Sequence, residues 1–457
     1  MLWTATEIAA ATGGTASAGF AATGVTFDSR EVAPGHLFVA LKGAETDGHR
    51  FLPQVFERGA AGAIVSQPIE QPHVLVGDTM AALNALAIAA RRRMHGKVIG
   101  VTGSVGKTGT KEALFAALDR GVPGRVHRSV KSYNNHTGVP LSLARMDACS
   151  RYGVFEMGMN HAGELAALTR LVRPHVAIIT AIAPAHTEFF SGEAAIADAK
   201  AEIFQGLEPG GTAIVPFDSP HGARLAAAAR PHAGQVISFG LNPGADVCAL
   251  ETMRSAGGGT FVTARLMTCE LGFTINQPGR HWVSNALAVL AAVEAVGGDV
   301  AAAGLALADL DGLAGRGARF SVPLADGGQA LVIDESYNAN PSSMRATLAV
   351  LAAEPATRRL AVLGEMRELG RESDAYHAGL AEPVLAAGVA GAVLVGGGMA
   401  ALAKALEGRL DFVHVADAAA ARAQLSSMLS DGDAVLIKGS NGVGLAAVVA
   451  ALKGGTA

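Results

Sequence analysis

The sequence is poor in aromatic residues and in cysteine. Phe, Trp and Tyr make up 5% of its 457 residues, and there are 3 cysteines. Because Cys149, Cys248 and Cys269 are far apart and form no C-x-x-C pair, they argue against a disulfide framework or a cysteine zinc site and fit a reducing compartment. The first ten residues lack a basic region and a long apolar stretch, so we expect no signal peptide and a cytoplasmic location.

The sequence also lacks an excess of one charge. It has 36 Lys and Arg against 40 Asp and Glu, a formal net charge of −4, so no overall field would recruit nucleic acid or an acidic membrane. The basic run Arg91–Arg93 closes a helical stretch, and we interpret it as a solvated helix end. Residues 383–403 carry no charge and are long enough to span a bilayer. Glycines divide this stretch, so we expect a buried strand with its neighbours and no membrane insertion.

Alternating strand and helix patterns predict an α/β fold with three domains. Half of the residues are hydrophobic, enough for each domain to bury its own core. Residues 1–85 form a small mixed module. Residues 86–312 repeat strand–helix units and should form a mostly parallel sheet, and residues 313–457 form a further α/β layer.

Residues 98–112, VIGVTGSVGKTGTKE, join an apolar run to a glycine-rich turn and a helix start. Backbone N–H groups at such a turn and the positive end of the helix dipole form an anion-binding cradle. Lys107 adds a charge for the outer phosphates, and the Thr108 hydroxyl is placed to bind Mg²⁺. A glycine-rich turn that binds nothing is the alternative, but the pattern predicts a bound nucleoside triphosphate. The expected phosphate-binding residues are Thr102, Gly103, Ser104, Val105, Gly106, Lys107 and Thr108.

Two predicted strands of the central domain end in polar residues. RYGVFE ends in Glu156, and HVAIITAIA ends near His186. Ligands bind outside the carboxyl ends of parallel strands, so we expect both side chains near the phosphate loop. Glu156 suits a magnesium-binding or water-positioning role, the alternative being a simple strand-end acid. For His186 a purely structural role is an equal alternative.

Lys200 interrupts an apolar helix face. In EAAIADAKAEIFQGL the apolar stripe contains Ile196 and Ile203, and at 3.6 residues per turn Lys200 falls inside it. A lysine on a core-facing stripe either extends its ammonium to water or has a function.

Polar loops follow predicted strands elsewhere. Residues 26–30 and 42–49 suit a phosphorylated or sugar ligand, although ordinary turns have the same composition. Asn285 begins a helical region and either contacts a nucleotide base or serves as a structural amide. Residues 334–340 follow a strand of the third domain and indicate a second ligand-facing edge.

These motifs together resemble the Mur ligase family over essentially the whole chain. The matching stretches are DSREVAPGHLFVALKG, TGSVGKTGTKE, SYNNHTGVPLSL, EMGMNHAGEL, AKAEIF, GRGARF, IDESYNANPSSM and GEMRELG. The resemblance implies a central P-loop domain between a UDP-sugar-binding N-terminal domain and a Rossmann-like C-terminal ligase domain. It also implies an ATP-dependent amide ligase that joins D-alanyl-D-alanine to UDP-N-acetylmuramoyl-tripeptide through an acyl phosphate. Such an enzyme would act as a cytoplasmic monomer in peptidoglycan precursor synthesis.

The resemblance also implies residue roles. Thr108 and Glu156 would bind one Mg²⁺, and His186 and Lys200 would serve a second ion. Lys200 resembles a family lysine that is often carbamylated, which turns a cation into a carboxylate. The residues implied to surround adenine, phosphates and ribose are Asn285, Arg319, Asp334 and Asn338. The residues implied to hold the substrate are Asp28, Ser29, Arg30, Gly43, Asp47, His49, Asn134 and Asn135.

Other classes of protein use the same loop. A small-molecule kinase would release a phosphorylated product, and a nucleotide-binding regulator would form no product. A kinase has no need of Lys200 beside His186, and a regulator leaves Asn134, Asn135 and Asn338 without a purpose. The phosphate loop alone also admits folylpolyglutamate synthetases. The D-N-P-R motif of the diaminopimelate-adding relative is absent.

Overall fold

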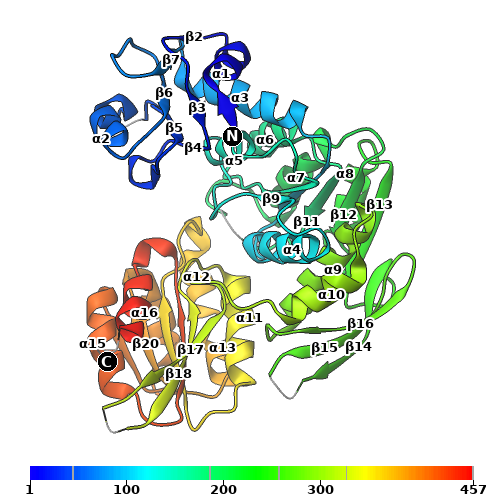
Figure 1. Cartoon of the computed structure of the whole chain (residues 1–457). Coiled ribbons are helices and arrows are strands. Elements are labelled where there is room, and N and C mark those ends of the chain that lie inside the picture. Colours follow the sequence, from blue (N-terminus) through cyan, green and yellow to red (C-terminus); the bar gives the residue numbers. More distant parts are fainter. Residues whose placement is uncertain (44–45, 185–186, 256–257, 326, 455–457) are drawn as a thin grey trace.

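The computed structural model describes residues 1–454 except 44–45, 185–186, 256–257 and 326. Besides a two-stranded sheet near the N-terminus, three larger sheets flanked by helices follow one another along the described chain. They lie in an arc with the N-terminal and C-terminal sheets at its ends (Figure 1). The α/β class and the parallel central sheet predicted from the sequence are confirmed.

The N-terminal sheet has the strand order β2-β7-β6-β5-β4, with β4 to β7 parallel. Ile8 and Leu37 are fully buried with Leu86 in a core that joins the sheet to its helices. The 3₁₀ turn η1 (Ser29–Glu31) follows β4, and η2 (Gly48–Phe51) follows β5. The strands are β1 (Trp3–Thr4), β2 (Thr15–Ala16), β3 (Ala21–Ala22), β4 (Gly24–Thr26), β5 (His36–Val39), β6 (Gly62–Val65) and β7 (His73–Leu75); the helices are α1 (Ala5–Thr12), α2 (Leu52–Glu57) and α3 (Thr79–Arg93).

The central sheet has the strand order β16-β15-β14-β13-β12-β11-β8-β10-β9. Strands β8 to β14 are parallel, β15 is antiparallel to β14, and β16 is antiparallel to β15. Because β10 and β11 flank β8 in parallel, their carboxyl ends meet at one edge. The strands are β8 (Lys97–Thr102), β9 (Val126–Arg128), β10 (Tyr152–Glu156), β11 (Val176–Ile179), β12 (Thr212–Pro216), β13 (Gln235–Gly240), β14 (Val247–Arg254), β15 (Thr260–Arg265) and β16 (Glu270–Ile275).

Helices cover both faces of the central sheet. Along β8, Ile99 and Val101 enter one core while Val98 enters the other, the alternation expected of a strand buried on both sides. One core is closed by α4 (Lys107–Gly121), α9 (Arg280–Ala295) and α10 (Val300–Ala308). The other is closed by α5 (Gly138–Ala144), α6 (Glu164–Val172), α7 (Glu193–Ala201) and α8 (Gly222–Ala229).

The C-terminal sheet has the strand order β17-β18-β22-β19-β20-β21, with only β17 antiparallel to its neighbour. It is also buried on both faces, since Ala361 and Val362 of β19 enter different cores. The strands are β17 (Ala318–Pro323), β18 (Gln329–Glu335), β19 (Arg359–Gly364), β20 (Val389–Val395), β21 (Phe412–Val415) and β22 (Ala434–Lys438); the helices are α11 (Pro341–Ala352), α12 (Ser373–Ala378), α13 (Ala381–Ala386), α14 (Ala400–Leu406), α15 (Ala418–Met428) and α16 (Ala446–Lys453).

The uncharged stretch 383–403 lies in α13, β20 and α14, as the glycine positions predict. Among the described residues, no helix has both the length and the apolar character needed to cross a bilayer. The predicted boundary at residues 85 and 86 falls within α3. The three domain ranges therefore stay predictions.

The interpretation of Arg91–Arg93 as a solvated helix end is wrong for two of its arginines. Arg91 is buried, and its guanidinium donates to the carbonyl oxygens of Val172 at 2.8 Å and Arg173 at 2.7 Å, at the end of α6. The Arg93 guanidinium lies 3.5 Å from the centre of the Trp3 ring. Both cations serve tertiary packing, which the local sequence does not show.

His175 makes the stability of this fold depend on pH. Its Nδ1 accepts the Val98 N–H at 3.0 Å, and burial lowers its pKa to about 4. The imidazole is protonated near pH 6.5 in the unfolded chain and near pH 4 in the folded chain, so stability is lost as pH falls through that window.

Between pH 7.5 and 5.5 we expect His175→Gln to lose about 1 kcal/mol less of its free energy of unfolding than wild type. The measurement is the thermal unfolding midpoint at the two pH values, which should fall less for the variant. The exposed His232→Gln variant should behave like wild type, and equal pH slopes in all three proteins would contradict this account.

Candidate functional site

The phosphate loop lies between β8 and the first turn of α4. Gly106 has a φ of 83°, in the left-handed region that glycine adopts without penalty. A Cβ at this position would lie 3.0 Å from Oδ1 of Asn285. The loop is tied to the chain after β11, because Ser104 Oγ donates to the Ala183 carbonyl at 2.9 Å and Ser104 N–H donates to the Ala181 carbonyl at 2.8 Å. The strand–turn–helix arrangement predicted from the sequence is confirmed.

Lys107 is the first residue of α4, and its side chain lines the cavity at the loop. Its Nζ donates to the Gly103 carbonyl at 2.7 Å. Burial lowers the pKa of Lys107, the charge of Glu156 partly offsets this effect, and Arg316 adds to it. A phosphate at the loop would give this ammonium a charged partner beside the N-terminal N–H groups of α4.

Glu156 ends β10 and is buried, with 1% of its surface exposed. Its Oε2 accepts the Thr108 hydroxyl at 2.9 Å, and its Oε1 accepts Asn134 Nδ2 at 2.7 Å. Asn134 is held in turn, because its carbonyl accepts the Gly158 N–H at 2.8 Å. The structure thus brings Thr108, the predicted magnesium partner of Glu156, and Asn134, predicted to bind substrate, into direct contact with Glu156.

Lys111 is a buried residue of the site that the sequence analysis missed. It lies one helical turn after Lys107, and its Nζ donates to the Lys131 carbonyl at 2.6 Å. Its ammonium also lies 2.9 Å from Glu112 and 3.9 Å from Oε2 of Glu156. The i, i+4 spacing from Lys107 is the signal that places it on the same helix face.

Lys200 is buried in α7, with 1% of its surface exposed. The prediction from the apolar stripe is therefore confirmed, and extension of the ammonium to water is excluded. Burial lowers the pKa of Lys200 well below its usual value, and the positive charge of Lys107 adds to this effect. His186, the predicted neighbour of Lys200, lies outside the described residues.

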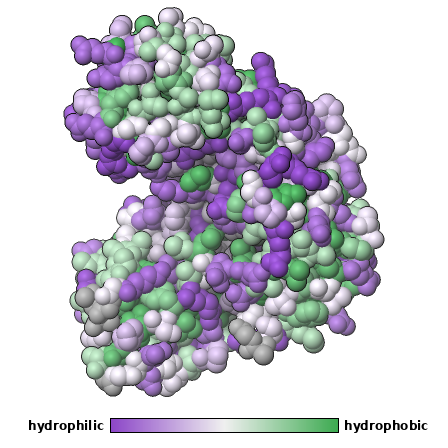
Figure 2. All heavy atoms as spheres, viewed as in Figure 1, coloured by the Kyte–Doolittle hydropathy of each residue, from purple (hydrophilic) through white to green (hydrophobic). Residues whose placement is uncertain are grey.

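A cavity of about 400 Å³ lies where the central and C-terminal parts face each other. The surface is hollowed between the N-terminal and C-terminal parts, and polar residues border this hollow (Figure 2). From the central part the cavity is lined by Ser104, Val105, Gly106, Lys107, Asn134, Glu156 and Asn285, and from the C-terminal part by Arg316, Glu335, Tyr337, Asn338 and Lys438.

Arg316, rather than Arg319, lines the cavity. The Arg316 guanidinium lies 4.0 Å from the centre of the Tyr337 ring, and its Nη2 lies 3.4 Å from Ser132 Oγ. Arg319 is on β17 and pairs with Glu354 at 2.5 Å, away from the lining residues. The nucleotide role implied for Arg319 stays a prediction.

The other predicted residues of the C-terminal part have local partners. Asp334 accepts the Gly315 N–H at 2.8 Å and the Ser336 hydroxyl at 2.6 Å, and it is not among the lining residues. Asn338 lines the cavity, and its carbonyl accepts Lys438 Nζ at 2.9 Å. Asp334 therefore shapes the turn that carries Arg316, while Asn338 faces the cavity.

The predicted N-terminal loops follow the neighbouring parallel strands β4 and β5. Asp28 pairs with Arg30 at 2.7 Å, and this hydrogen-bonded pair lowers the pKa of Asp28 to about 2. Asp47 contacts Nδ1 of His49 at 2.6 Å. Ser29 lies between Asp28 and Arg30 in η1, and Gly43 N–H donates to the Thr46 carbonyl at 2.8 Å. Both loops thus lie at one edge of the N-terminal sheet.

Asn135 differs from its neighbour Asn134 in facing the start of α5. Its Oδ1 accepts the Gly138 N–H at 2.9 Å and the Thr137 hydroxyl at 3.0 Å. The substrate contact implied for Asn135 stays a prediction.

A phosphate loop, a buried carboxylate and a facing arginine across a cavity between two α/β parts define a nucleotide-dependent α/β enzyme. Three family models match the chain: the Mur ligase family catalytic domain over residues 21–103, the Mur ligase middle domain over 101–293, and the Mur ligase glutamate ligase domain over 318–441. The chain belongs to the Mur ligase family.

Relatives match over nearly the whole chain. The UDP-N-acetylmuramoyl-tripeptide–D-alanyl-D-alanine ligase of Escherichia coli K12 is 36% identical over 94% of this chain and 93% of its own. The same ligase of Rickettsia prowazekii is 31% identical over 98% of this chain and 99% of its own. The crystal structure of MurF from Acinetobacter baumannii has a TM-score of 0.85 at 32% identity, covering 98% of both chains. The MurF ligase of Thermotoga maritima in complex with ADP has a TM-score of 0.77 at 25% identity, covering 95% of this chain and 97% of its own.

Proposed function

We propose that this chain joins D-alanyl-D-alanine to UDP-N-acetylmuramoyl-tripeptide with hydrolysis of ATP to ADP and phosphate. The reaction supplies the pentapeptide precursor of peptidoglycan. The names of relatives that match more than nine-tenths of the chain support these substrates. The single structural observation that carries the proposal is the cavity in which the phosphate loop and Glu156 face Arg316 of the C-terminal part.

The reaction needs a phosphoryl group to activate a carboxylate. A carboxylate oxygen of the tripeptide attacks the γ-phosphorus of ATP, the bond to the β-phosphate oxygen breaks, and ADP leaves. The amine of D-alanyl-D-alanine then attacks the acyl carbon, phosphate leaves with the C–O electrons, and the amine loses a proton. Lys107 and the N–H groups of α4 face the phosphates from one side, and Arg316 faces them from the other, which stabilises the charge of the transition state.

Magnesium would be held by oxygen atoms of Thr108, at the start of α4, and of Glu156, at the end of β10. Thr108 Oγ1 and Glu156 Oε2 lie 2.9 Å apart, and hydroxyl and carboxylate oxygens are ligands that Mg²⁺ prefers. The described residues include no group of three or more His, Cys, Asp or Glu placed to bind a metal. When bound, the ion would neutralise phosphate charge. For a second ion we infer His186 and Lys200 as ligands.

Lys200 would contribute to that second site as a carbamate. Because burial lowers its pKa, a larger fraction of its amine is neutral than in an exposed lysine. A neutral amine adds to carbon dioxide, forming an N–C bond and losing a proton, and the product is a carboxylate. This change would turn a buried cation into an oxygen ligand.

The N-terminal loops would hold the uridine nucleotide end of the substrate. Arg30 is exposed although its guanidinium pairs with Asp28, and it offers donors to a phosphate. Asp28, Ser29 and the loop of Gly43, Asp47 and His49 complete this edge. We further infer a cytoplasmic monomer that acts on neither nucleic acid nor membrane. The net charge of −4 gives no overall attraction to nucleic acid or to an acidic membrane.

Lys107→Ala should lower turnover by at least ~10²-fold, the effect of losing one transition-state charge contact. The measurement is mass-spectrometric quantification of the amide product formed from ATP, UDP-N-acetylmuramoyl-tripeptide and D-alanyl-D-alanine. A phosphorylated tripeptide without amide in the wild-type reaction would indicate a kinase and contradict the proposal. Turnover of the variant within about threefold of wild type would contradict the role of Lys107.

Arg316→Ala should weaken ADP binding by about tenfold or more, because it removes a charged donor that faces the phosphate loop. Arg319→Ala is the matched control, since it removes an arginine three residues away that pairs with Glu354. Calorimetric titration of each full-length variant with ADP and magnesium measures the effect. Equal losses in the two variants, or a larger loss for Arg319→Ala, would overturn the choice of Arg316.

Lys200→Ala should lose turnover and regain part of it when acetate or formate is added, because a small carboxylate can replace the carbamate. The same salts should leave wild type and Lys107→Ala unchanged, which controls for general salt effects. Absence of any rescue in Lys200→Ala, with the variant folded by circular dichroism, would count against the carbamate.

A further inference from the structure

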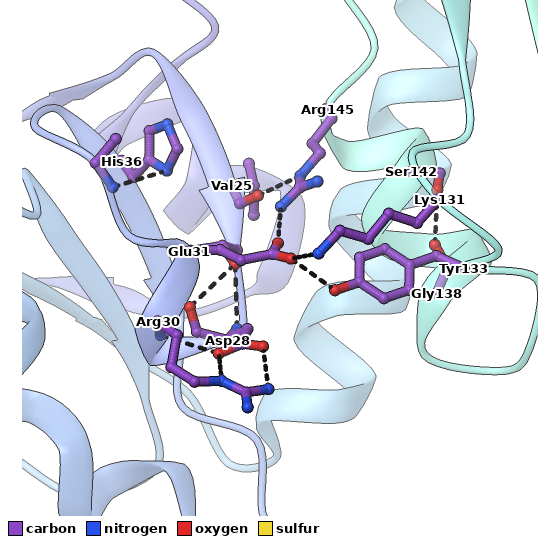
Figure 3. A network of polar contacts seen from close by, with 12 residues as sticks. Val25, Asp28, Arg30, Glu31, His36, Lys131, Tyr133, Gly138, Ser142 and Arg145 are labelled. Atoms are coloured by element: carbon purple, nitrogen blue, oxygen red, sulfur yellow. Dashed lines mark hydrogen bonds and ion pairs between the residues drawn. The ribbon is translucent and has the colours of Figure 1, made fainter. Parts of the chain in front are cut away.

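Glu31 connects the N-terminal part to the central part through three donors. Its Oε1 accepts hydrogen bonds from Lys131 Nζ and from the Tyr133 hydroxyl, the latter at 3.0 Å. Its Oε2 lies 3.6 Å from Arg145. Figure 3 shows the carboxylate between these side chains, with the turn of Asp28 and Arg30 on its other side.

This contact orders the interface more than it stabilises the fold. The Lys131 side chain is 64% exposed, and exposed ion pairs contribute little to stability. Glu31 and Arg145 are less exposed, and the Tyr133 ring lies 5.9 Å from that of Phe27. Partial burial would raise the pKa of Glu31, but the hydrogen bonds from Lys131 and Tyr133 outweigh it and hold the pKa below its usual value. The carboxylate therefore stays charged at neutral pH and fixes where its partners lie.

Two partners of Glu31, Lys131 and Tyr133, belong to a short loop, residues 131–134, whose other end enters the nucleotide cavity. Lys131 has a φ of 53°, in the left-handed region, and its carbonyl accepts Lys111 Nζ at 2.6 Å. A lysine in this conformation is strained unless its surroundings hold it. Glu31 holds the side chain of Lys131, and Lys111 holds its carbonyl.

The inner residues of the same loop touch the phosphate-binding groups. Ser132 Oγ lies 3.4 Å from Thr108 Oγ1 and 3.4 Å from Nη2 of Arg316. Asn134 donates to Glu156 at 2.7 Å. A shift of this loop would therefore move the residues proposed to contact the phosphates and those proposed to hold magnesium at the same time.

The turn that carries Glu31 also carries the residues expected to face the uridine nucleotide. Asp28 caps the start of η1 and pairs with Arg30, and the Glu31 N–H donates to the Asp28 carbonyl at 3.0 Å. Because η1 is only three residues long, a ligand that fixes Asp28 and Arg30 also fixes Glu31.

We propose that Glu31 is a positioning residue that couples the binding of the UDP-linked substrate to the binding of ATP. This inference rests on the proposed function, which supplies the two ligands. Substrate bound at η1 holds Glu31, Glu31 holds the loop of residues 131–134, and the loop holds Ser132 and Asn134 in the nucleotide cavity. A ligand that orders shared groups lowers the ordering cost of the other ligand, and the effect is reciprocal.

The test measures binding of a non-hydrolysable ATP analogue to the full-length protein with magnesium, in the absence and presence of saturating UDP-N-acetylmuramoyl-tripeptide. For wild type we expect the tripeptide to tighten analogue binding by about fivefold or more. For Glu31→Gln, which keeps the shape and loses the charge, we expect this ratio to fall to about 1, with each ligand alone bound within about threefold of wild type. Lys131→Met and Tyr133→Phe, which keep the backbone and the ring, should lower the ratio in part.

Glu7→Gln is the matched control. Glu7 is also an N-terminal carboxylate with a local role, since it accepts the Thr4 N–H at 2.7 Å, but it does not touch residues 131–134. It should keep the wild-type ratio even if its melting temperature falls.

A wild-type ratio of about 1, or the same ratio in wild type and Glu31→Gln, would overturn the coupling even if the amide product forms. Coupling that depends on Glu31 in a protein that forms no amide would support this inference while contradicting the proposed function.

Discussion

The site depends on one buried carboxylate at the end of β10. Glu156 accepts the Thr108 hydroxyl from α4 and the Asn134 amide from the loop before α5, with the Lys111 ammonium at 3.9 Å. An ionised carboxylate in a buried position requires such donors, since an unpaired charge there would cost several kcal/mol. The same donors fix the start of the phosphate-binding helix against the neighbouring strand. Glu156 thus joins the fold of the central sheet to the chemistry of the phosphate loop.

The cavity around this carboxylate has positive groups on two separate parts of the chain. Lys107 lies on the central side, and Arg316 and Lys438 lie on the C-terminal side. Burial lowers the pKa values of Lys107 and Lys438, because it removes their ammonium groups from water. An anion bound between the two parts would offset this desolvation cost. In the proposed reaction a nucleoside triphosphate would supply that anion and would contact both parts at once. The N-terminal part is joined on the other side, through Glu31 and Arg145.

Local patterns predicted those features that depend on neighbouring residues. Strand and helix periodicity within about fifteen residues predicted three of them. These are the phosphate loop, the strand that ends in Glu156, and the buried helix face that contains Lys200. Features set by distant packing were missed. The burial of Arg91 depends on the end of α6, and the sequence analysis chose Arg319 of GRGAR although Arg316 faces the cavity. A signal for Arg316 was present in the sequence, because it lies between Gly315 and Gly317. These glycines have φ of 72° and 90° and place Arg316 in a turn, whereas Arg319 lies in an edge strand. The domain boundaries and the contact between His186 and Lys200 remain predictions.

The central claim is that the terminal phosphoryl group of ATP is transferred to the substrate carboxylate before the amide forms. Tripeptide labelled with ¹⁸O in its terminal carboxylate tests this claim directly, because phosphate that leaves an acyl phosphate keeps one of the carboxylate oxygens. We predict that inorganic phosphate isolated after one round of amide formation carries ¹⁸O, as measured by mass spectrometry or by the isotope shift of its ³¹P resonance. Amide formation with unlabelled phosphate would contradict the account.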